Sequence, residues 1–294
     1  MEMSSQKKLK EDIASSDGVR ANHKWSRTYH HGFTNHVKVG GRSEMEEGRP
    51  ARTAGERQYE EIQIACDKVK ELEYLREGFN IFAVFQGTLI ARGLIQFCEG
   101  APPVKNFISL AGPQAGVAAI PFCENIFGIL CPVIQAWFNG IVYTEEGQDF
   151  AAAATYYKLP NKIEEYLKYS RFLPKLNNER PGERNSTYKE RFSSLHNLVL
   201  LANENENVLI PKESAWFGYY KDGSTEGILP AQEIDLYKED WIGLRSLNEV
   251  GRVRFEQVPG AHAEASDETL SEFVVPFLVD WNQQQPSTMP MPCN

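Results

Sequence analysis

Short strand-like runs alternate with stretches of helical periodicity from about residue 58 onward. The strand-like runs lie at residues 81–85, 104–110, 197–201 and 252–258. After the first run, Ile90, Leu94 and Phe97 fall at i, i+4 and i+7, which predicts a helix over residues 87–98. Strands that alternate with helices predict an α/β fold, here with a partial parallel sheet of about four strands beginning at Ile81.

Two further helices flank this core in the sequence. The first is predicted over residues 58–76, where Ile62, Cys66, Val69 and Leu72 share one face. The second begins near the carboxyl end, where Ser266 and Asp267 cap an apolar stripe that continues to Trp281. Pro276 lies within that stripe and is expected to kink the helix.

The remaining segments lack the regular alternation of strand and helix. Residues 113–195 combine short helical patterns with a polar, proline-containing stretch and do not alternate like a simple βαβ repeat. Residues 1–56 are polar and are predicted to be an extended or poorly ordered leader. The predicted domain therefore covers residues 57–285, with residues 286–294 as a disordered tail.

The leader holds four of the six histidines, namely His23, His30, His31 and His36. Their irregular spacing favours a flexible leader, or translated sequence from outside the ancestral coding region, over a metal-binding tract. No Cys-x-x-Cys or mixed Cys/His ligand spacing occurs, so we predict neither zinc nor any other cofactor.

Charge narrows the possible partners. The formal net charge is −9, and residues beyond 56 carry 21 Lys and Arg against 32 Asp and Glu. An acidic body argues against nonspecific nucleic-acid binding. No run approaches the roughly 18 apolar residues that a membrane span needs. The opening residues contain no apolar core of a secretory signal, so a cytoplasmic location is one expectation.

The strand at 81–85, the Gln86–Gly87 turn and the following helix form the strand–turn–helix unit of a nucleophile elbow. That unit normally carries the pattern G-x-S-x-G. Here Ala83 and Gly87 occupy the two glycine positions, and Phe85 occupies the serine position. Phenylalanine has no proton to give and no lone pair for attack, so the elbow is predicted to lack its nucleophile.

The surrounding residues make the resemblance specific. Eight ordered blocks carry it, namely GFNIFAVFQG, RGLIQFCEG, PPVKNFISLAGPQAG, LPKLNNERPGERNSTYKERFSSL, WFGYY, LPAQE, DWIGL and VPGAH. Over roughly Gln58 to Leu278 the chain resembles the palmitoyl-protein thioesterases, and plant members most closely. The resemblance implies an α/β-hydrolase fold in which residues 113–195 are a lid insertion over the acyl-binding surface. It also implies substrates that are fatty-acylated proteins, whose long-chain acyl groups are cleaved from cysteine thioesters.

In α/β-hydrolases the catalytic order is nucleophile, acid and histidine. His262 directly follows the last predicted strand and is the candidate general base. Counting back from Trp216, the resemblance places the acid at Glu206, where the family has aspartate. The extra methylene of glutamate requires the loop to compensate. Glu204 is a neighbouring candidate, and a solvated acidic loop without catalytic role is the alternative.

One oxyanion donor is expected from the Gln86 backbone N–H. The resemblance takes the second donor from a loop after an early strand, and nothing before Gln58 matches that segment. We therefore expect the early strands to be missing and the strand at 81–85 to form an unpaired edge. Thr88 and Ser109 are not placed to replace the nucleophile.

Five cysteines and one sequon bear on the compartment. The resemblance implies two disulfides, Cys66–Cys98 and Cys123–Cys131, whereas buried thiols are the alternative in a reducing cytosol. Cys293 is expected to be unpaired. Asn185 begins an Asn-Ser-Thr glycosylation sequon. The resemblance implies the lysosome or vacuole, or secretion, in conflict with the cytoplasmic expectation.

We interpret the chain as a thioesterase-family member whose hydrolysis is impaired at Phe85. One alternative is a catalytically inactive protein that binds acyl chains. Another is a decayed or mispredicted gene product.

Overall fold

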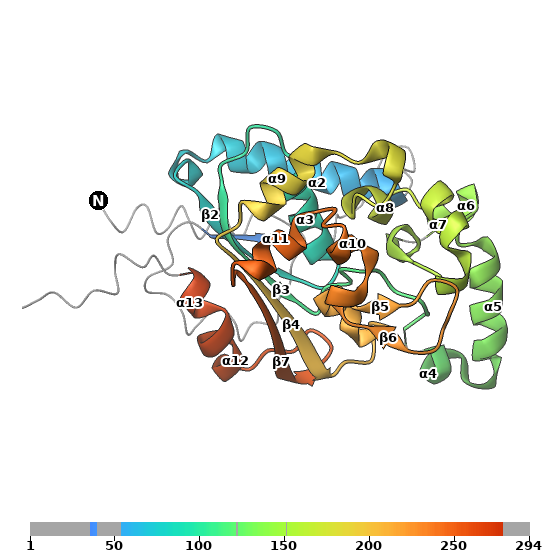
Figure 1. The fold of residues 1–294 in the computed structure, drawn as a ribbon. Coiled ribbons are helices and arrows are strands. Elements are labelled where there is room, and N and C mark those ends of the chain that lie inside the picture. The colour runs from blue at the N-terminus through green and yellow to red at the C-terminus, as the bar shows by residue number, and fades with distance from the viewer. Residues whose placement is uncertain (1–35, 40–53, 122, 151, 279–294) are drawn as a thin grey trace, which may run out of the picture.

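The computed structural model describes residues 36–39, 54–121, 123–150 and 152–278. Within these residues the main sheet has five strands in the order β1-β2-β3-β4-β7, all parallel. The strands are β1 His36–Val39, β2 Phe79–Val84, β3 Val104–Leu110, β4 Asn197–Asn205 and β7 Val253–Ala261 (Figure 1). The parallel α/β architecture expected from the sequence is confirmed.

The central strands are apolar on both faces because helices cover both sides of the sheet. Phe107 and Ile108 are adjacent on β3, yet they belong to two separate cores. Phe107 packs on the face covered by α2 (Ala54–Glu71), α3 (Gly87–Phe97) and α9 (Ser186–Ser193). Ile108 packs on the opposite face. That face is covered by α12 (Asp267–Phe273) and α13 (Val275–Leu278) (Figure 1).

Helices α2 and α3 approach each other closely at Gly93. A Cβ atom at Gly93 would lie 2.2 Å from the Cδ1 atom of Ile62 on α2. A side chain at position 93 would therefore displace the end of Ile62, so glycine permits the close approach of the two helices. Helix α2 is followed by η1 (Glu73–Leu75), and Leu75 is fully buried beneath the start of β2.

The predicted lid is a series of short helices between β3 and β4. It contains α4 Cys123–Phe127, η2 Gly128–Leu130, α5 Cys131–Ile141, α6 Glu145–Phe150, η3 Ala152–Tyr156, η4 Pro160–Lys162, α7 Ile163–Tyr169, α8 Leu173–Leu176, η5 Pro181–Glu183 and α9. Helices α5, α6 and α7 lie at the edge of the molecule farthest from α12 and α13 (Figure 1). Among the described residues, no helix is long and apolar enough to cross a membrane.

A second irregular region lies between β4 and β7. It contains η6 Lys212–Trp216, β5 Tyr219–Tyr220, β6 Ile228–Leu229, η7 Ala231–Glu233, α10 Asp235–Lys238 and α11 Leu244–Glu249. Strands β5 and β6 form a small antiparallel sheet of their own. They lie on the lid side of the main sheet (Figure 1).

The expected unpaired edge at β2 is wrong. Strand β1, from within the predicted leader, pairs with β2 over the register His36 with Asn80 to Val39 with Ala83. The sheet therefore begins one strand earlier than Ile81, and α2 likewise begins at Ala54, inside the leader. The order predicted for residues 1–35, 40–53 and 279–294 lies outside the described residues, as does the free Cys293.

Two strands are longer than their apolar runs. Strand β4 continues through polar residues to Asn205, and β7 continues to Ala261, because the two strands stay paired up to that point. The sequence placed this part of β4 in a loop. The terminal helix is divided at Val274, close to Pro276, which cannot donate a helical backbone hydrogen bond.

Candidate active site

Phe85 follows β2 in a left-handed backbone conformation, with φ at +49°. Its N–H donates to the carbonyl of Leu110 on β3 at 2.9 Å. Its carbonyl accepts from both the N–H and the Oγ1 of Thr88, at 3.0 and 2.7 Å. The chain thus leaves the strand in a sharp turn and enters α3 at Gly87. Such a conformation costs of order 1–3 kcal/mol in a non-glycine residue.

His262 and Glu206 lie beyond the carboxyl ends of two neighbouring strands, β7 and β4. The Nδ1 of His262 lies 2.8 and 2.7 Å from the two carboxylate oxygens of Glu206. Because a carboxylate only accepts, Nδ1 carries the proton in this pair, and Nε2 is left as the other functional nitrogen. The carboxylate therefore fixes the orientation and the tautomer of the imidazole.

The Glu206 carboxylate is held by three groups. The N–H groups of Val208 and Leu209 donate to one of its oxygens, at 2.8 and 3.0 Å, in addition to the contact with His262. Burial alone would raise the pKa of Glu206, but the hydrogen bonds from His262, Leu209 and Val208 together lower that pKa below its usual value. The carboxylate is thus kept in its charged form.

The ring of Phe85 packs against the imidazole of His262. The ring centroids are 4.7 Å apart and the planes meet at 89°. Phe85, His262 and Glu206, which are separated by up to 177 positions in the sequence, are thereby brought together at one end of the sheet. A serine at position 85 would project from the same backbone toward the same histidine.

The other hydroxyl and carboxyl candidates near the elbow are placed differently. Ser109 is fully buried and accepts a hydrogen bond from the Nε2 of Gln114 at 2.8 Å. Thr88 is also fully buried, with its hydroxyl directed at the carbonyl of Phe85. Glu204 is exposed near the end of β4, whereas Glu206 contacts the histidine.

Gln86, the candidate oxyanion donor, occupies the position directly before α3. Backbone N–H groups at the start of a helix have no partner within the helix, so they can be directed at a ligand. Strand β1 lies beside β2, which is where the sequence expected an early strand to be missing. The residues that follow β1, 40–53, lie outside the described residues.

Two supporting side chains were not found from the sequence. Asn203 on β4 accepts from the N–H of Ala263 at 2.9 Å and donates to the carbonyl of Glu264 at 2.8 Å. It thereby fixes the loop that carries His262. No pattern in the polar segment around Asn203 distinguished it from its exposed neighbours.

Arg92 is the other. It is fully buried on α3, and its guanidinium donates to the carbonyl of Gln114 at 3.1 Å and to the Oδ1 of Asn177 at 2.9 Å. Burial lowers the pKa of Arg92 to about 9, against the opposing attraction of Glu179. Arg92 joins the elbow helix to two parts of the lid. A single arginine in an otherwise uncharged helix was the available signal.

Both expected disulfides are present, with Cα–Cα distances of 5.6 Å for Cys66–Cys98 and 5.3 Å for Cys123–Cys131. The first joins α2 to the end of α3, and the second closes the turn that contains α4 and η2. Asn185 caps α9, where its Oδ1 accepts from the N–H of Thr187 at 2.9 Å.

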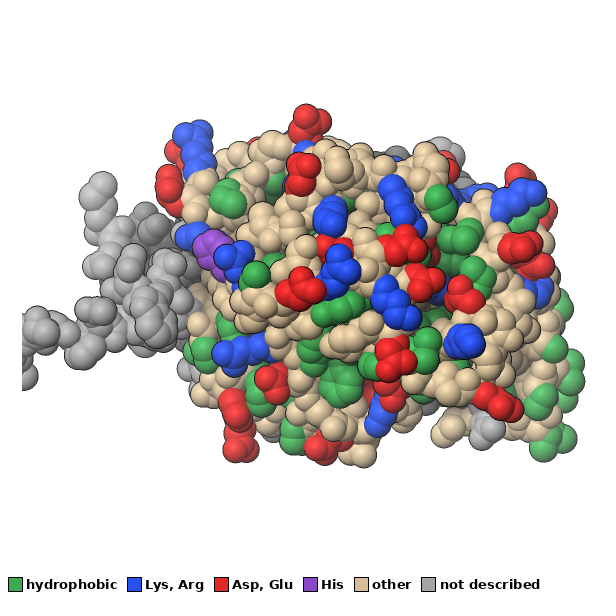
Figure 2. Space-filling model, in the orientation of Figure 1, with side chains coloured by type: hydrophobic (Ala, Val, Ile, Leu, Met, Phe, Trp, Pro, Cys, Tyr) green, Lys and Arg blue, Asp and Glu red, His purple; other side chains and the backbone are tan. Residues whose placement is uncertain are grey.

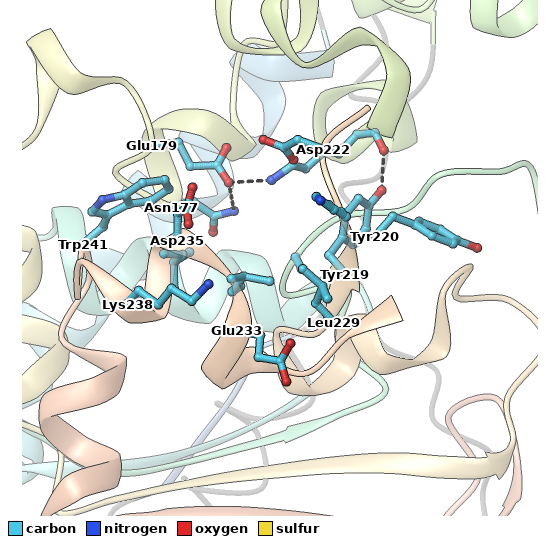
Figure 3. Close-up of a pocket in the computed structure, with 15 residues that line it drawn as sticks. Asn177, Glu179, Tyr219, Tyr220, Asp222, Leu229, Glu233, Asp235, Lys238 and Trp241 are labelled. Atoms are coloured by element: carbon cyan, nitrogen blue, oxygen red, sulfur yellow. Dashed lines mark hydrogen bonds and ion pairs between the residues drawn. The ribbon is translucent and has the colours of Figure 1, made fainter. Parts of the chain in front are cut away.

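Two cavities lie on the lid side of the sheet, away from the elbow. The first has a volume of about 260 Å³, and its lining includes Asn177, Glu179, Asp222, Glu233, Asp235 and Lys238 (Figure 3). The second, of about 300 Å³, is lined by Pro160 to Glu165 with Asp222 and Gly223. Neither is lined by Phe85, Glu206 or His262, and the lining of both combines charged with apolar side chains.

The parallel sheet, the left-handed turn after β2 and the His–carboxylate pair at the strand ends define an α/β-hydrolase. The chain belongs to the palmitoyl-protein thioesterase family. The family model described as palmitoyl protein thioesterase matches residues 11–262, so the match begins within the predicted leader.

The chain is similar to several relatives. It is 38% identical over 214 residues to palmitoyl-protein thioesterase 1 of Caenorhabditis elegans, covering 73% of this chain and 70% of the relative. It is 38% identical over 207 residues to palmitoyl-protein thioesterase 3 of Dictyostelium discoideum, covering 70% and 68%. It is 31% identical over 225 residues to the lysosomal thioesterase PPT2 homolog of Drosophila melanogaster, covering 76% and 75%. A closer similarity to plant members stays a prediction.

Proposed function

We propose that this chain is a palmitoyl-protein thioesterase-type protein in which hydrolysis is lost at the nucleophile. The observation that carries the proposal is the contact between Phe85 and His262, with ring centroids 4.7 Å apart. The family label and the names of the relatives point to fatty acyl thioesters of protein cysteines as the substrate class.

The proposed roles follow from the geometry. His262 is the general base, because its Nε2 lies opposite the nitrogen held by Glu206. Glu206 orients the imidazole and stabilises its charged form. Gln86 N–H is one oxyanion donor. At position 85 the reaction needs an oxygen that gives its proton to His262 and attacks the thioester carbon, and a phenyl ring can do neither.

The acyl-chain-binding alternative receives less support. Pockets for fatty acyl chains are lined mainly by apolar side chains. The first cavity described above places Glu179, Asp222 and Lys158 among its apolar side chains, so an acyl chain there would lie against charged groups. We therefore favour the impaired hydrolase over a dedicated acyl carrier.

The test is hydrolysis of a palmitoyl thioester by the purified chain and its variants. We expect the wild type to be indistinguishable from background. Phe85→Ser is expected to recover little turnover, because no segment before Gln58 has the sequence of the loop that supplies the second oxyanion donor in the resembled family, and loss of one such donor costs about 10²–10³-fold. Phe85→Ala is the matched control, since it removes the ring without adding a nucleophile. Wild-type turnover that His262→Ala abolishes would show the proposal to be wrong.

The proposed compartment is the lysosome or vacuole, or the cell exterior. Disulfides persist in oxidising compartments, and two are formed here. One relative is also named a lysosomal thioesterase. In such a compartment Asn185 would be a glycosylation site, because its sequon begins a surface helix, α9.

A further inference from the structure

Helix α5 directs its two polar side chains inward beside the buried Phe138 and leaves apolar side chains exposed on its outer side. Its two polar side chains, Gln135 and Asn139, are directed toward the protein, where Gln135 accepts from the N–H of Ile120 at 2.8 Å and donates to Asn139 at 2.6 Å. On the outer side, Val133 and Trp137 are exposed. A helix on the surface of a water-soluble protein normally shows the opposite arrangement. The outer side of α5 is thus suited to an apolar medium.

The exposed apolar side chains continue from α5 into α4 and η2. We call this set the lid apolar surface, and it consists of Ile126, Phe127, Ile129, Leu130, Val133 and Trp137. Each member is at least 38% exposed, and Ile129 is 95% exposed. Hydrophobic side chains gather along the edge of the molecule formed by α4 and α5 (Figure 2). Contiguous exposed apolar patches mark protein–protein or membrane contact.

No charged residue occurs from Asn125 to Thr144. The absence of charge means that this whole segment can leave water without burying an ionised group. Trp137 adds a ring of the type that prefers the boundary between lipid headgroups and acyl chains. The Cys123–Cys131 disulfide closes the turn beneath these side chains and links α4 to the start of α5.

We propose that the lid apolar surface inserts into the surface of a lipid bilayer with uncharged headgroups. A protein partner that receives a helix usually offers or needs a groove. These side chains instead project from the outermost edge, and neither cavity described above is lined by any of them. Residues beyond 56 carry a net charge of −11, which disfavours an anionic surface. The proposal does not depend on whether the site hydrolyses thioesters.

Three hydrogen bonds, joined by short backbone segments, connect this surface to the candidate active site. Gln135 on α5 holds Ile120, and the N–H of Ala118 donates to the carbonyl of Ile210 at 2.7 Å. Directly before Ile210, the N–H of Leu209 donates to the Glu206 carboxylate. The lid apolar surface is thus joined to the carboxylate that orients His262 through residues 118–120 and 209–210.

The experiment is flotation of the full chain with vesicles of phosphatidylcholine alone. We expect the wild type to float with the vesicles, and Ile129→Glu/Val133→Glu to bind at least tenfold more weakly. Ile64→Glu is the matched control, because Ile64 is a 57% exposed apolar residue on α2, outside this surface. We expect it to bind as the wild type does. Circular dichroism and thermal unfolding verify that both variants are folded.

A second readout locates the contact. Brominated phosphatidylcholine should quench tryptophan fluorescence in the wild type, and Trp137→Phe should remove most of that quenching. A wild type that does not float, or a double variant that floats equally well, would overturn the proposal. The proposal would also fail if the wild type formed a dimer that the double variant dissociates, without binding vesicles. That result would assign the surface to contact between copies of this chain.

Discussion

Phe85 and His262 face each other across the carboxyl ends of β2 and β7, with their rings perpendicular and 4.7 Å apart between centroids. The left-handed backbone of Phe85 presents its side chain at the position a nucleophile needs, although the side chain itself is inert. The backbone geometry of the elbow is thus retained independently of the residue that makes it useful. The free-energy cost of the left-handed backbone is retained as well, and this cost can be measured.

We predict that Phe85→Gly is more stable than Phe85→Ala by about 1 kcal/mol. Both substitutions remove the same packing against His262. Alanine, however, still bears a Cβ in a left-handed conformation, which costs roughly 1–2 kcal/mol, whereas glycine does not. Urea unfolding of the two variants measures the difference directly.

The matched control is Ala83, two residues earlier in the regular part of β2. There Ala83→Gly should destabilise by roughly 0.5–1 kcal/mol, because glycine loses more backbone freedom in a strand. If position 85 shows the same sign as position 83, the turn is not left-handed in solution.

The hydrogen-bonded pair of Glu206 and His262 predicts that the stability of the protein depends on pH. Hydrogen bonds hold the pKa of Glu206 below its usual value, despite burial. A carboxyl with a depressed folded pKa contributes stability above its unfolded pKa of 4.5, and that stability is lost as the pH falls through the folded value. Glu206→Gln should therefore cost roughly 1–3 kcal/mol at pH 7 and clearly less at pH 3.

Glu204→Gln is the control for this series, since Glu204 lies on the same segment with its side chain exposed. Its free energy of unfolding should follow that of the wild type at each pH. Urea titrations at pH 7, 5 and 3 would supply the comparison. A constant difference between Glu206→Gln and the wild type across this range would contradict the charged pair.

The sequence predicted the elements that depend on local pattern. The run predicted at 104–110 is β3 without change, because five of its seven residues are buried and the run is mostly apolar. The elbow was found because Phe85 is flanked by a strand and by Gly87, and these neighbours specify the turn even without serine. The histidine was found because it directly follows a strand.

What the sequence did not predict depends on contacts between distant segments. Strand β1 is only four residues long and polar in part, so its pairing with β2 was not visible in its pattern. Asn203 acts through Ala263 and Glu264, which are 60 or more positions away. The outward direction of Trp137 could not be inferred from α5 either, because apolar residues occur on both of its sides.

Asn185 has two separable roles, in the cap of α9 and in the sequon. In a secretory expression host we predict that Asn185→Gln loses the glycan and also about 1 kcal/mol of stability, because the cap is lost. Thr187→Ala should lose only the glycan, since the cap uses the backbone N–H of residue 187. Mass spectrometry and thermal unfolding of deglycosylated protein separate the two effects. An unglycosylated wild type would contradict the site assignment.

Arg92 couples the elbow helix to the lid, because its guanidinium reaches acceptors at Gln114 and Asn177 at once. Lysine cannot span both with one ammonium group, and it would keep a buried charge with fewer partners. We predict that Arg92→Lys destabilises by about 3 kcal/mol. Arg191→Lys is the control: Arg191 on α9 makes a comparable bond to the carbonyl of Gln96 but is only half-buried, so its loss should cost less than about 1 kcal/mol. Equal losses in the free energy of unfolding for the two variants would show that burial of Arg92 does not strengthen its hydrogen bonds to Gln114 and Asn177.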